Sequence, residues 1–115
     1  MRTLNDYFIS GRISDISTAG STFVAVPDGG RIIKIMTVLQ GAISGGNAAI
    51  TFEIGGTAVT NAGITVAHSG SAVGTMDSSV PTALNEVEED GSIEMITDGN
   101  STGAKALDVT FVIRR

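Results

Sequence analysis

The chain has 115 residues, which suits a single domain, and its composition of 42% hydrophobic but only 4% aromatic residues predicts a core of aliphatic side chains. Its net charge of -5 and its seven scattered Lys and Arg residues argue against binding to nucleic acid, because affinity for phosphate comes from clustered positive charge. Cysteine is absent, which excludes disulfides and thiolate metal sites, and no stretch approaches the roughly eighteen apolar residues of a membrane span.

Residues 1–10 differ in texture from the rest of the chain and hold its only tyrosine. We expect an N-terminal arm with a single helical turn that places Leu4, Tyr7 and Phe8 on one side. These side chains either fold back to close one end of the core or dock on a neighbouring subunit, and they are our candidate contact residues. The segment lacks the pattern of a secretion signal, so we expect synthesis and assembly without export.

Residues 11–115 alternate apolar and polar positions in short runs separated by glycine-rich turns, a pattern typical of antiparallel strands. A strand over 22–26 leads through a Pro-Asp-Gly-Gly turn into a long strand over 31–40. Both faces of the long strand carry apolar residues, so we place it at the centre of its sheet. One face is expected to hold Ile33, Ile35, Thr37 and Leu39, and the other Ile32, Lys34, Met36 and Val38.

The middle of the chain predicts two further reversals. After a loop over 41–47, Ile50, Phe52 and Ile54 alternate with less apolar residues in a half-buried strand. The pair Gly55-Gly56 then predicts a hairpin. A second reversal, at Asn61-Ala62-Gly63, leads into a short strand that begins at Ile64.

Residues 67–82 are small and polar with little periodicity, which makes them the longest irregular segment and our second choice for a contact surface. Strands are predicted over 82–87, 93–96 and 107–113. The whole pattern predicts an all-β fold, an antiparallel β-sandwich of jelly-roll type with seven or eight strands. It forms a single domain over 11–115, preceded by the arm over 1–10.

A set of residues for nucleophilic catalysis is nominally present. His68, the only histidine, stands near Ser69, Ser71 and Asp77 in the sequence. A triad is defined by its geometry, however, and the Gly-x-Ser-x-Gly elbow is missing. We therefore expect no enzymatic activity, no catalytic residue and no cofactor.

Acidic side chains before a glycine turn offer oxygen ligands to a divalent cation. They are Glu86, Glu88, Glu89 and Asp90, with Asp98 and Asn100 across a neighbouring turn. The ligand spacing of a calcium loop is missing, and such residues more often form a solvated rim. We therefore assign no metal site and leave cation binding by the loop over 86–90 open.

Only 17% of the residues are charged, whereas Gly, Ser and Thr are abundant, so the surface is neutral and rich in hydroxyl groups. A surface with few charges is poorly protected against association. We therefore expect part of it to be covered by other protein, either copies of the chain or a larger partner.

Six segments carry a family resemblance: VPDGGRI (26–32), LQGAI (39–43), IGGTAV (54–59), SGSA (69–72), TDGNST (97–102) and VTFVI (109–113). In the spacing of their turns and their high content of small residues, residues 10–115 resemble small virion proteins of tailed bacteriophages, and in particular capsid decoration (cement) proteins. The N-terminal pattern of the lambda-type decoration protein is not present.

The resemblance implies a non-enzymatic jelly-roll protein on the capsid exterior of the virion, synthesised in the host cytoplasm. Its implied partners are the major capsid protein, whose subunit junctions it binds and stabilises, and copies of itself in a homotrimer. It gives no individual binding residue, so the assignment of Leu4, Tyr7 and Phe8 rests on the arm alone. A phage fibre module and a carbohydrate-binding β-sandwich remain the alternatives.

Overall fold

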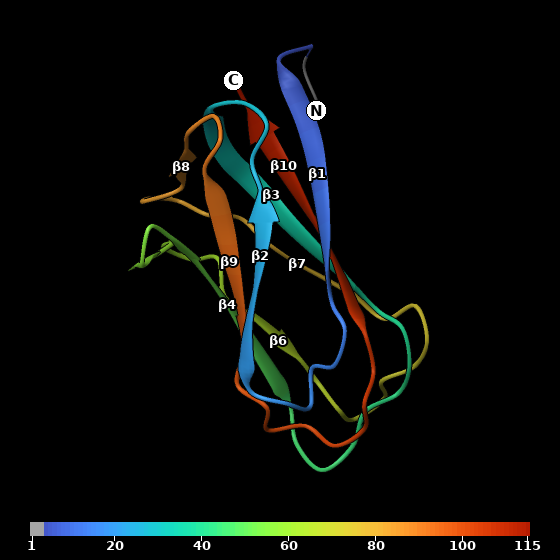
Figure 1. Cartoon of the computed structure of the whole chain (residues 1–115). Coiled ribbons are helices and arrows are strands. Elements are labelled where there is room, and N and C mark those ends of the chain that lie inside the picture. Colours follow the sequence, from blue (N-terminus) through green and yellow to red (C-terminus); the bar gives the residue numbers. More distant parts are fainter. Residues whose placement is uncertain (1–3) are drawn as a thin grey trace.

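A computed structural model of the chain shows two β-sheets packed face to face (Figure 1), which confirms the predicted all-β sandwich. The structure describes residues 4–115, and no helix occurs among them. The strands are β1 (Asp6–Ile13), β2 (Gly20–Ala25), β3 (Gly30–Leu39), β4 (Ala48–Ile54), β5 (Thr57–Ala58), β6 (Ile64–Val66), β7 (Met76–Ser79), β8 (Glu86–Val87), β9 (Ser92–Thr97) and β10 (Leu107–Arg114).

The strand order is that of a jelly roll. The first sheet has the order β1-β10-β3-β7, with β8 also on β3, and the second has the order β2-β9-β4-β5, with β6 also on β4. All pairings are antiparallel. β7 and β8 share one edge of β3, and β5 and β6 share one edge of β4, so the ten strands occupy eight positions in the two sheets. Apart from the hairpin from β4 to β5, the chain crosses from one sheet to the other between one position and the next along the sequence. The expected seven or eight strands become ten because two outer positions are each split.

The core lies between the sheets and consists of aliphatic side chains around one aromatic pair. Phe52 of β4 and Phe111 of β10 meet edge to face, with ring centroids 5.6 Å apart and planes at 89°. Both rings are fully buried. Complete burial of such a side chain stabilises the folded state by about 1.5–3 kcal/mol. Because the two rings come from different sheets and the chain has few other large side chains, this pair is a main contact that holds the sheets together.

Strand β3 is central, as predicted, since β10 lies on one side of it and β7 and β8 on the other. A β-bulge interrupts its pairing with β10. Lys34 pairs with Val112 but Ile32 pairs with the following residue, which leaves Ile33 as an extra residue. As a result Ile32 and Ile35 are both fully buried on the same face. The prediction that Ile33 shares a face with Ile35, and that Ile32 lies on the opposite face, is therefore wrong.

The predicted helical turn near the N-terminus is wrong where the structure describes it. Residues 6–13 are extended and pair with β10 along their whole length, from Asp6 opposite Arg114 to Ile13 opposite Leu107. This pairing decides the conformation, because it satisfies backbone groups that an isolated helical turn leaves open. Residues 6–10 of the expected arm therefore belong to the first sheet, and residues 1–3 lie outside the described part of the chain.

Two segments in the second half differ in extent from their predictions. The irregular segment over 67–82 contains β7, and the strand expected over 82–87 is reduced to the two residues of β8. The hairpin at Gly55-Gly56 joins β4 to β5 as predicted. Both glycines have positive φ, 59° and 82°, which the tight turn requires.

A glycine in β1 allows the two sheets to approach each other. A Cβ atom added to Gly11 would lie 2.4 Å from Val24 Cγ2 and 3.0 Å from Met95 Cε, both in the second sheet. We expect Gly11→Ala to lower the free energy of unfolding by about 1–3 kcal/mol, the usual cost of overpacking, measured by urea denaturation. Gly20→Ala in β2 is the matched control, because its Cβ meets nothing within 4 Å. Equal stability of the two variants would contradict this close packing.

Candidate functional site

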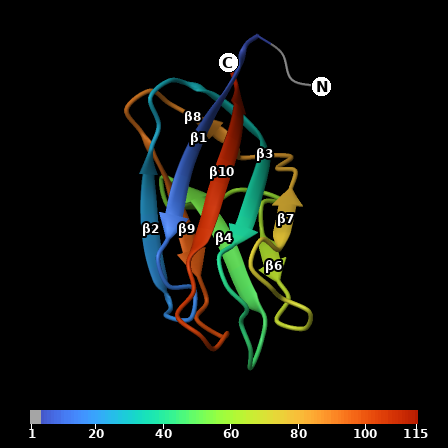
Figure 2. The same ribbon diagram turned by 90° about the vertical axis from the view of Figure 1, so that its right-hand side faces the viewer.

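The two ends of the described chain are held together beside β1, at one end of the sandwich, as Figure 2 shows. The Arg115 guanidinium lies 4.5 Å from the centre of the Tyr7 ring, and its Nε is 2.6 Å from Asp28 Oδ2. The Tyr7 hydroxyl donates a hydrogen bond to the backbone carbonyl of Asp28. We call these residues, together with Asp6 and Arg114, the terminal clasp.

The Asp6–Arg114 ion pair is the most protected part of the terminal clasp. Arg114 Nε and Nη2 lie 2.8 and 3.1 Å from the two carboxylate oxygens of Asp6. The Asp6 side chain is 1% exposed. The hydrogen bonds from the guanidinium to the carboxylate raise the pKa of Arg114. This bidentate pair fixes the start of β1 against the end of β10.

A spacing in the sequence could have revealed these ion pairs. β1 carries Asp6 and Arg12, and β10 carries Asp108 and Arg114, so each strand has one acid and one arginine six positions apart. Antiparallel pairing then brings unlike charges together twice, and Arg12 Nε indeed lies 2.6 Å from Asp108 Oδ1. This signal becomes visible only when the first strand is paired with the last, a pairing that local alternation does not predict.

The contacts of the terminal clasp shift the pKa values of Asp28 and Tyr7 in opposite directions. The hydrogen bond from Arg115 lowers the pKa of Asp28, aided by the backbone N–H of Gly29. Partial burial raises the pKa of Tyr7, and the negative charge of Asp28 raises it further. The tyrosine therefore remains a hydrogen-bond donor, and the aspartate a negatively charged partner of Arg115, at neutral pH.

The structure divides the three candidate contact residues into two groups. Leu4 is fully exposed and Phe8 is 59% exposed on the outer side of β1. Tyr7 points to the other side of the strand and is held in the terminal clasp. Leu4, just before β1, and Phe8, on β1, thus offer two exposed apolar side chains near the chain ends, which we call the Leu4–Phe8 surface, whereas Tyr7 positions the strand that carries Phe8.

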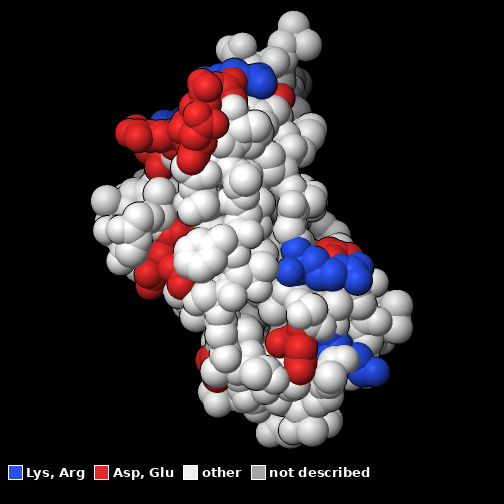
Figure 3. All heavy atoms as spheres, in the orientation of Figure 1, with Lys and Arg blue, Asp and Glu red and all other residues white. Residues whose placement is uncertain are grey.

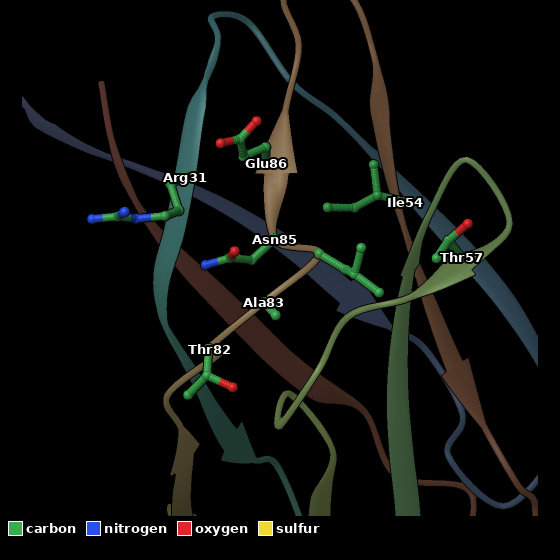
Figure 4. A pocket seen from close by; sticks show the side chains of 8 residues that line it. Arg31, Ile54, Thr57, Thr82, Ala83, Asn85 and Glu86 are labelled. Atoms are coloured by element: carbon green, nitrogen blue, oxygen red, sulfur yellow. The ribbon is translucent and has the colours of Figure 1, made fainter.

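A second candidate is a hollow of about 530 Å³ at the edge of the sandwich opposite β1, between β8 and β5 (Figure 4). Its lining residues are Arg31, Ile54, Thr57, Thr82, Ala83, Leu84, Asn85 and Glu86. Leu84 has a φ of 53° and is 61% exposed at this hollow. Asn85 is buried, and its side-chain amide donates to the Ile32 carbonyl at 2.7 Å. The hollow offers hydroxyl, amide and aliphatic groups but no aromatic ring.

The nominal Ser-His-Asp residues are not joined by their described hydrogen bonds. The Ser71 hydroxyl lies 3.0 Å from the Ile43 carbonyl oxygen and 2.8 Å from that of His68. The His68 Nδ1 atom lies 2.8 Å from Asn47 Oδ1. Asp77 stands in β7 opposite Thr37, and its Oδ2 atom is buried without a hydrogen-bond partner among the described residues. The serine and histidine therefore serve to hold loops in place.

A cluster of acidic side chains lies near the end of the sandwich that carries the chain termini, and other acidic side chains are scattered over the same face (Figure 3). Glu86 and Glu88 line a hollow there together with Arg114 and Arg115. Asp98 instead stabilises its own turn by accepting hydrogen bonds from backbone N–H groups, that of Asn100 at 3.1 Å among them. Within residues 4–115 no group of three or more His, Asp or Glu side chains is arranged to hold a metal ion.

Neither a protein-family model nor a curated protein sequence matches the chain. In the part of the chain that the structure describes, no helix has the length and hydropathy needed to cross a membrane.

The terminal clasp makes a prediction for acid solution. Because Arg115 lowers the folded-state pKa of Asp28 below its ordinary value of 3.8, the folded chain binds this proton less readily than the unfolded chain. The stabilisation is thus complete above about pH 5 and is lost as the pH falls through the lowered pKa. We expect the urea midpoint of the wild type to fall more steeply between pH 5 and pH 3 than that of Asp28→Asn. Glu89→Gln is the control, and equal slopes for Asp28→Asn and wild type would contradict the prediction.

Proposed function

We propose that this chain is a structural virion protein, a capsid decoration (cement) protein that binds the outside of the major capsid protein shell and stabilises it. The observation that carries the proposal is the Leu4–Phe8 surface: Phe8 is exposed on the edge strand β1, which the terminal clasp holds against β10, and Leu4 is exposed just before that strand. A held apolar surface loses little conformational entropy on binding, which suits a protein whose role is to hold others together.

Three further features support this proposal. Jelly-roll sandwiches recur among viral capsid and lectin domains, which is an argument from analogy of fold. The surface carries few charges, so little desolvation cost opposes protein contact. Repetition of a modest contact over a lattice also gains avidity without a deep pocket. A homotrimer, as the resemblance implies, needs one surface of a copy to meet a different surface of the next.

Binding to expanded capsid shells that lack the protein tests the proposal. We expect the purified chain to sediment with such shells and to give ordered density at subunit junctions in cryo-electron microscopy. The Leu4→Ser/Phe8→Ser double variant should bind at least tenfold more weakly, because each apolar side chain contributes about 1.5–3 kcal/mol when fully buried. Point substitutions are preferable to truncation here, since deleting residues 1–10 removes more than half of β1.

Phe23→Ser is the matched control for this experiment. Phe23 lies on β2 and is 63% exposed, close to the 59% of Phe8, but it belongs to the other sheet. It should leave shell binding unchanged. Absence of binding by the wild-type chain would overturn the proposed function, and equal losses in Phe23→Ser and the double variant would overturn the role of the Leu4–Phe8 surface.

The second candidate is a carbohydrate-binding module, alone or within a phage fibre, and the hollow in Figure 4 favours it. Thr57 and Thr82 offer hydroxyl groups of the kind that sugars bind, while Ile54 and Leu84 offer apolar contact. The lining lacks the aromatic platform on which sugar rings commonly stack. Binding on a glycan array that Thr82→Val abolishes, with no affinity for shells, would establish this function in place of the first.

A further inference from the structure

Strand β1 is a long open edge. It is the outermost strand of the first sheet, with eight residues, and only β10 pairs with it among the described strands. The other margin of the same sheet is divided between β7 and β8, of four and two residues. Short or interrupted strands, proline and charged side chains usually protect a sheet edge. β1 contains no proline, and its two charged residues, Asp6 and Arg12, are both paired with residues of β10. The backbone groups over residues 8–12 that do not face β10 form a template for another strand.

The pairing with β10 shows which backbone groups of β1 point outward. The N–H of Arg115 donates to the carbonyl of Asn5 at 3.1 Å, so Asn5 directs its backbone groups toward β10. In an antiparallel ladder, alternate residues direct their N–H and C=O to opposite sides of the strand. Continuing from Asn5, the residues that direct both groups to the open edge include Phe8, Ser10 and Arg12.

We propose that the open edge of β1 binds the β1 strand of a second copy of this chain, antiparallel, about a two-fold axis at Ile9. In this register Phe8 exchanges both backbone hydrogen bonds with Ser10 of the second copy, and Ile9 faces Ile9 across the axis. The residues of β1 whose backbone groups point outward have even numbers, so in any register that pairs these groups the numbers of two opposed residues add up to an even sum. The sum of 18 keeps the paired residues within the strand, Asp6–Ile13.

The charges of β1 favour this register. The strand has a carboxylate, Asp6, near its start and a guanidinium, Arg12, near its end. Antiparallel pairing about Ile9 places Arg12 opposite Asp6 of the second copy, at both ends of the contact. With the existing pairs to Arg114 and Asp108, each end becomes a row of alternating charge across four strands. Parallel pairing would instead oppose like charges, which destabilises a cross-strand pair.

The side chains on both faces of β1 also fit a second copy. On the outer face, the exposed Phe8 becomes a diagonal neighbour of Phe8 of the second copy, within reach of aromatic contact. On the inner face, Ile9 lines a hollow of about 610 Å³ between β1 and β2, with Val24 and Pro27 on its other side. Ile9 of the second copy would enter the space beside it. Tyr7 would stand opposite Gly11, which has no side chain to obstruct it.

The edge of β2 is a weaker candidate for the same role. Its six residues carry no charge, so no ion pair would select one register of strand pairing over another. Pro27, which lacks a backbone N–H, follows closely after its end. Pairing through β1 instead joins two five-stranded sheets into one continuous sheet. The contact is isologous, with the same surface used by both copies, and so produces a pair rather than the trimer that the resemblance implies. It does not depend on the proposed capsid role.

A cysteine at the axis tests the register directly. The chain has no cysteine, so Ile9→Cys introduces a single thiol. Opposed residues of a non-hydrogen-bonded antiparallel pair have Cα atoms about 4.5 Å apart, within the range a disulfide spans. We expect mild oxidation to convert most of the Ile9→Cys protein into a disulfide-linked dimer that reductant reverses. Phe23→Cys, with an exposed thiol on the other sheet, is the control, and cross-linking of Ile9→Cys no greater than this control overturns the register.

The mass of the purified wild-type chain in solution gives an independent test. Light scattering on a sizing column should give twice the monomer mass of 11.7 kDa at about 100 μM protein. Ser10→Pro removes an outward N–H without removing a backbone hydrogen bond to β10, so it should be monomeric; the side-chain contact with Thr110 that it loses is lost in Ser10→Ala as well. Ser10→Ala keeps that N–H and should remain dimeric. A monomeric or trimeric wild type, or a dimer that persists in Ser10→Pro, overturns the proposal, as does occupation of the edge by a strand of a different protein. These measurements use no shells, so their failure is separate from failure of the proposed function.

Discussion

The position of the last strand determines the rest of the structure. β10 lies between β1 and β3, pairs with both along its length, and carries Phe111 on its inner face against Phe52 of the second sheet. Without β10, the first strand would have no partner among the described strands, and the core would lose one of its two large aromatic side chains. The Leu4–Phe8 surface and the open edge of β1 both exist because β10 holds β1 in place.

The strands that could be predicted from the sequence are those whose environment is encoded locally. β3 carries apolar residues on both faces, as a central strand requires, β10 alternates buried apolar residues with mostly polar ones, and Gly55-Gly56 encodes its hairpin through residues that accept positive φ. β7 was missed because Met76–Ser79 lies at a sheet margin and places polar side chains on its inner face. The bulge at Ile33 was equally hidden, since it depends on the partner strand rather than on β3 itself.

Three residues beside the chain ends were named from the sequence, but the other residues of the terminal clasp and the geometry were not. Leu4, Tyr7 and Phe8 were grouped by helical spacing, whereas strand geometry separates Tyr7 from Phe8 onto opposite sides of β1. The turn of Tyr7 toward Asp28 and Arg115 depends on contacts between segments far apart in the sequence. Local spacing cannot decide such contacts, because tertiary pairing overrides weak local preferences in a short segment. The only signal of the β1–β10 pairing in the sequence is the matching positions of the charged residues in these two strands.

The ion pair between Asp6 and Arg114 joins residues 108 positions apart. During synthesis on the ribosome, β1 therefore emerges early but has to wait for nearly the whole chain before its partner strand exists. Contacts of such long sequence separation form slowly, since loop closure precedes any stabilising contact. The first sheet thus assembles only after translation of the described chain is almost complete. Until then both edges of β1 are exposed, and newly made chains depend on dilution or chaperones to avoid premature pairing.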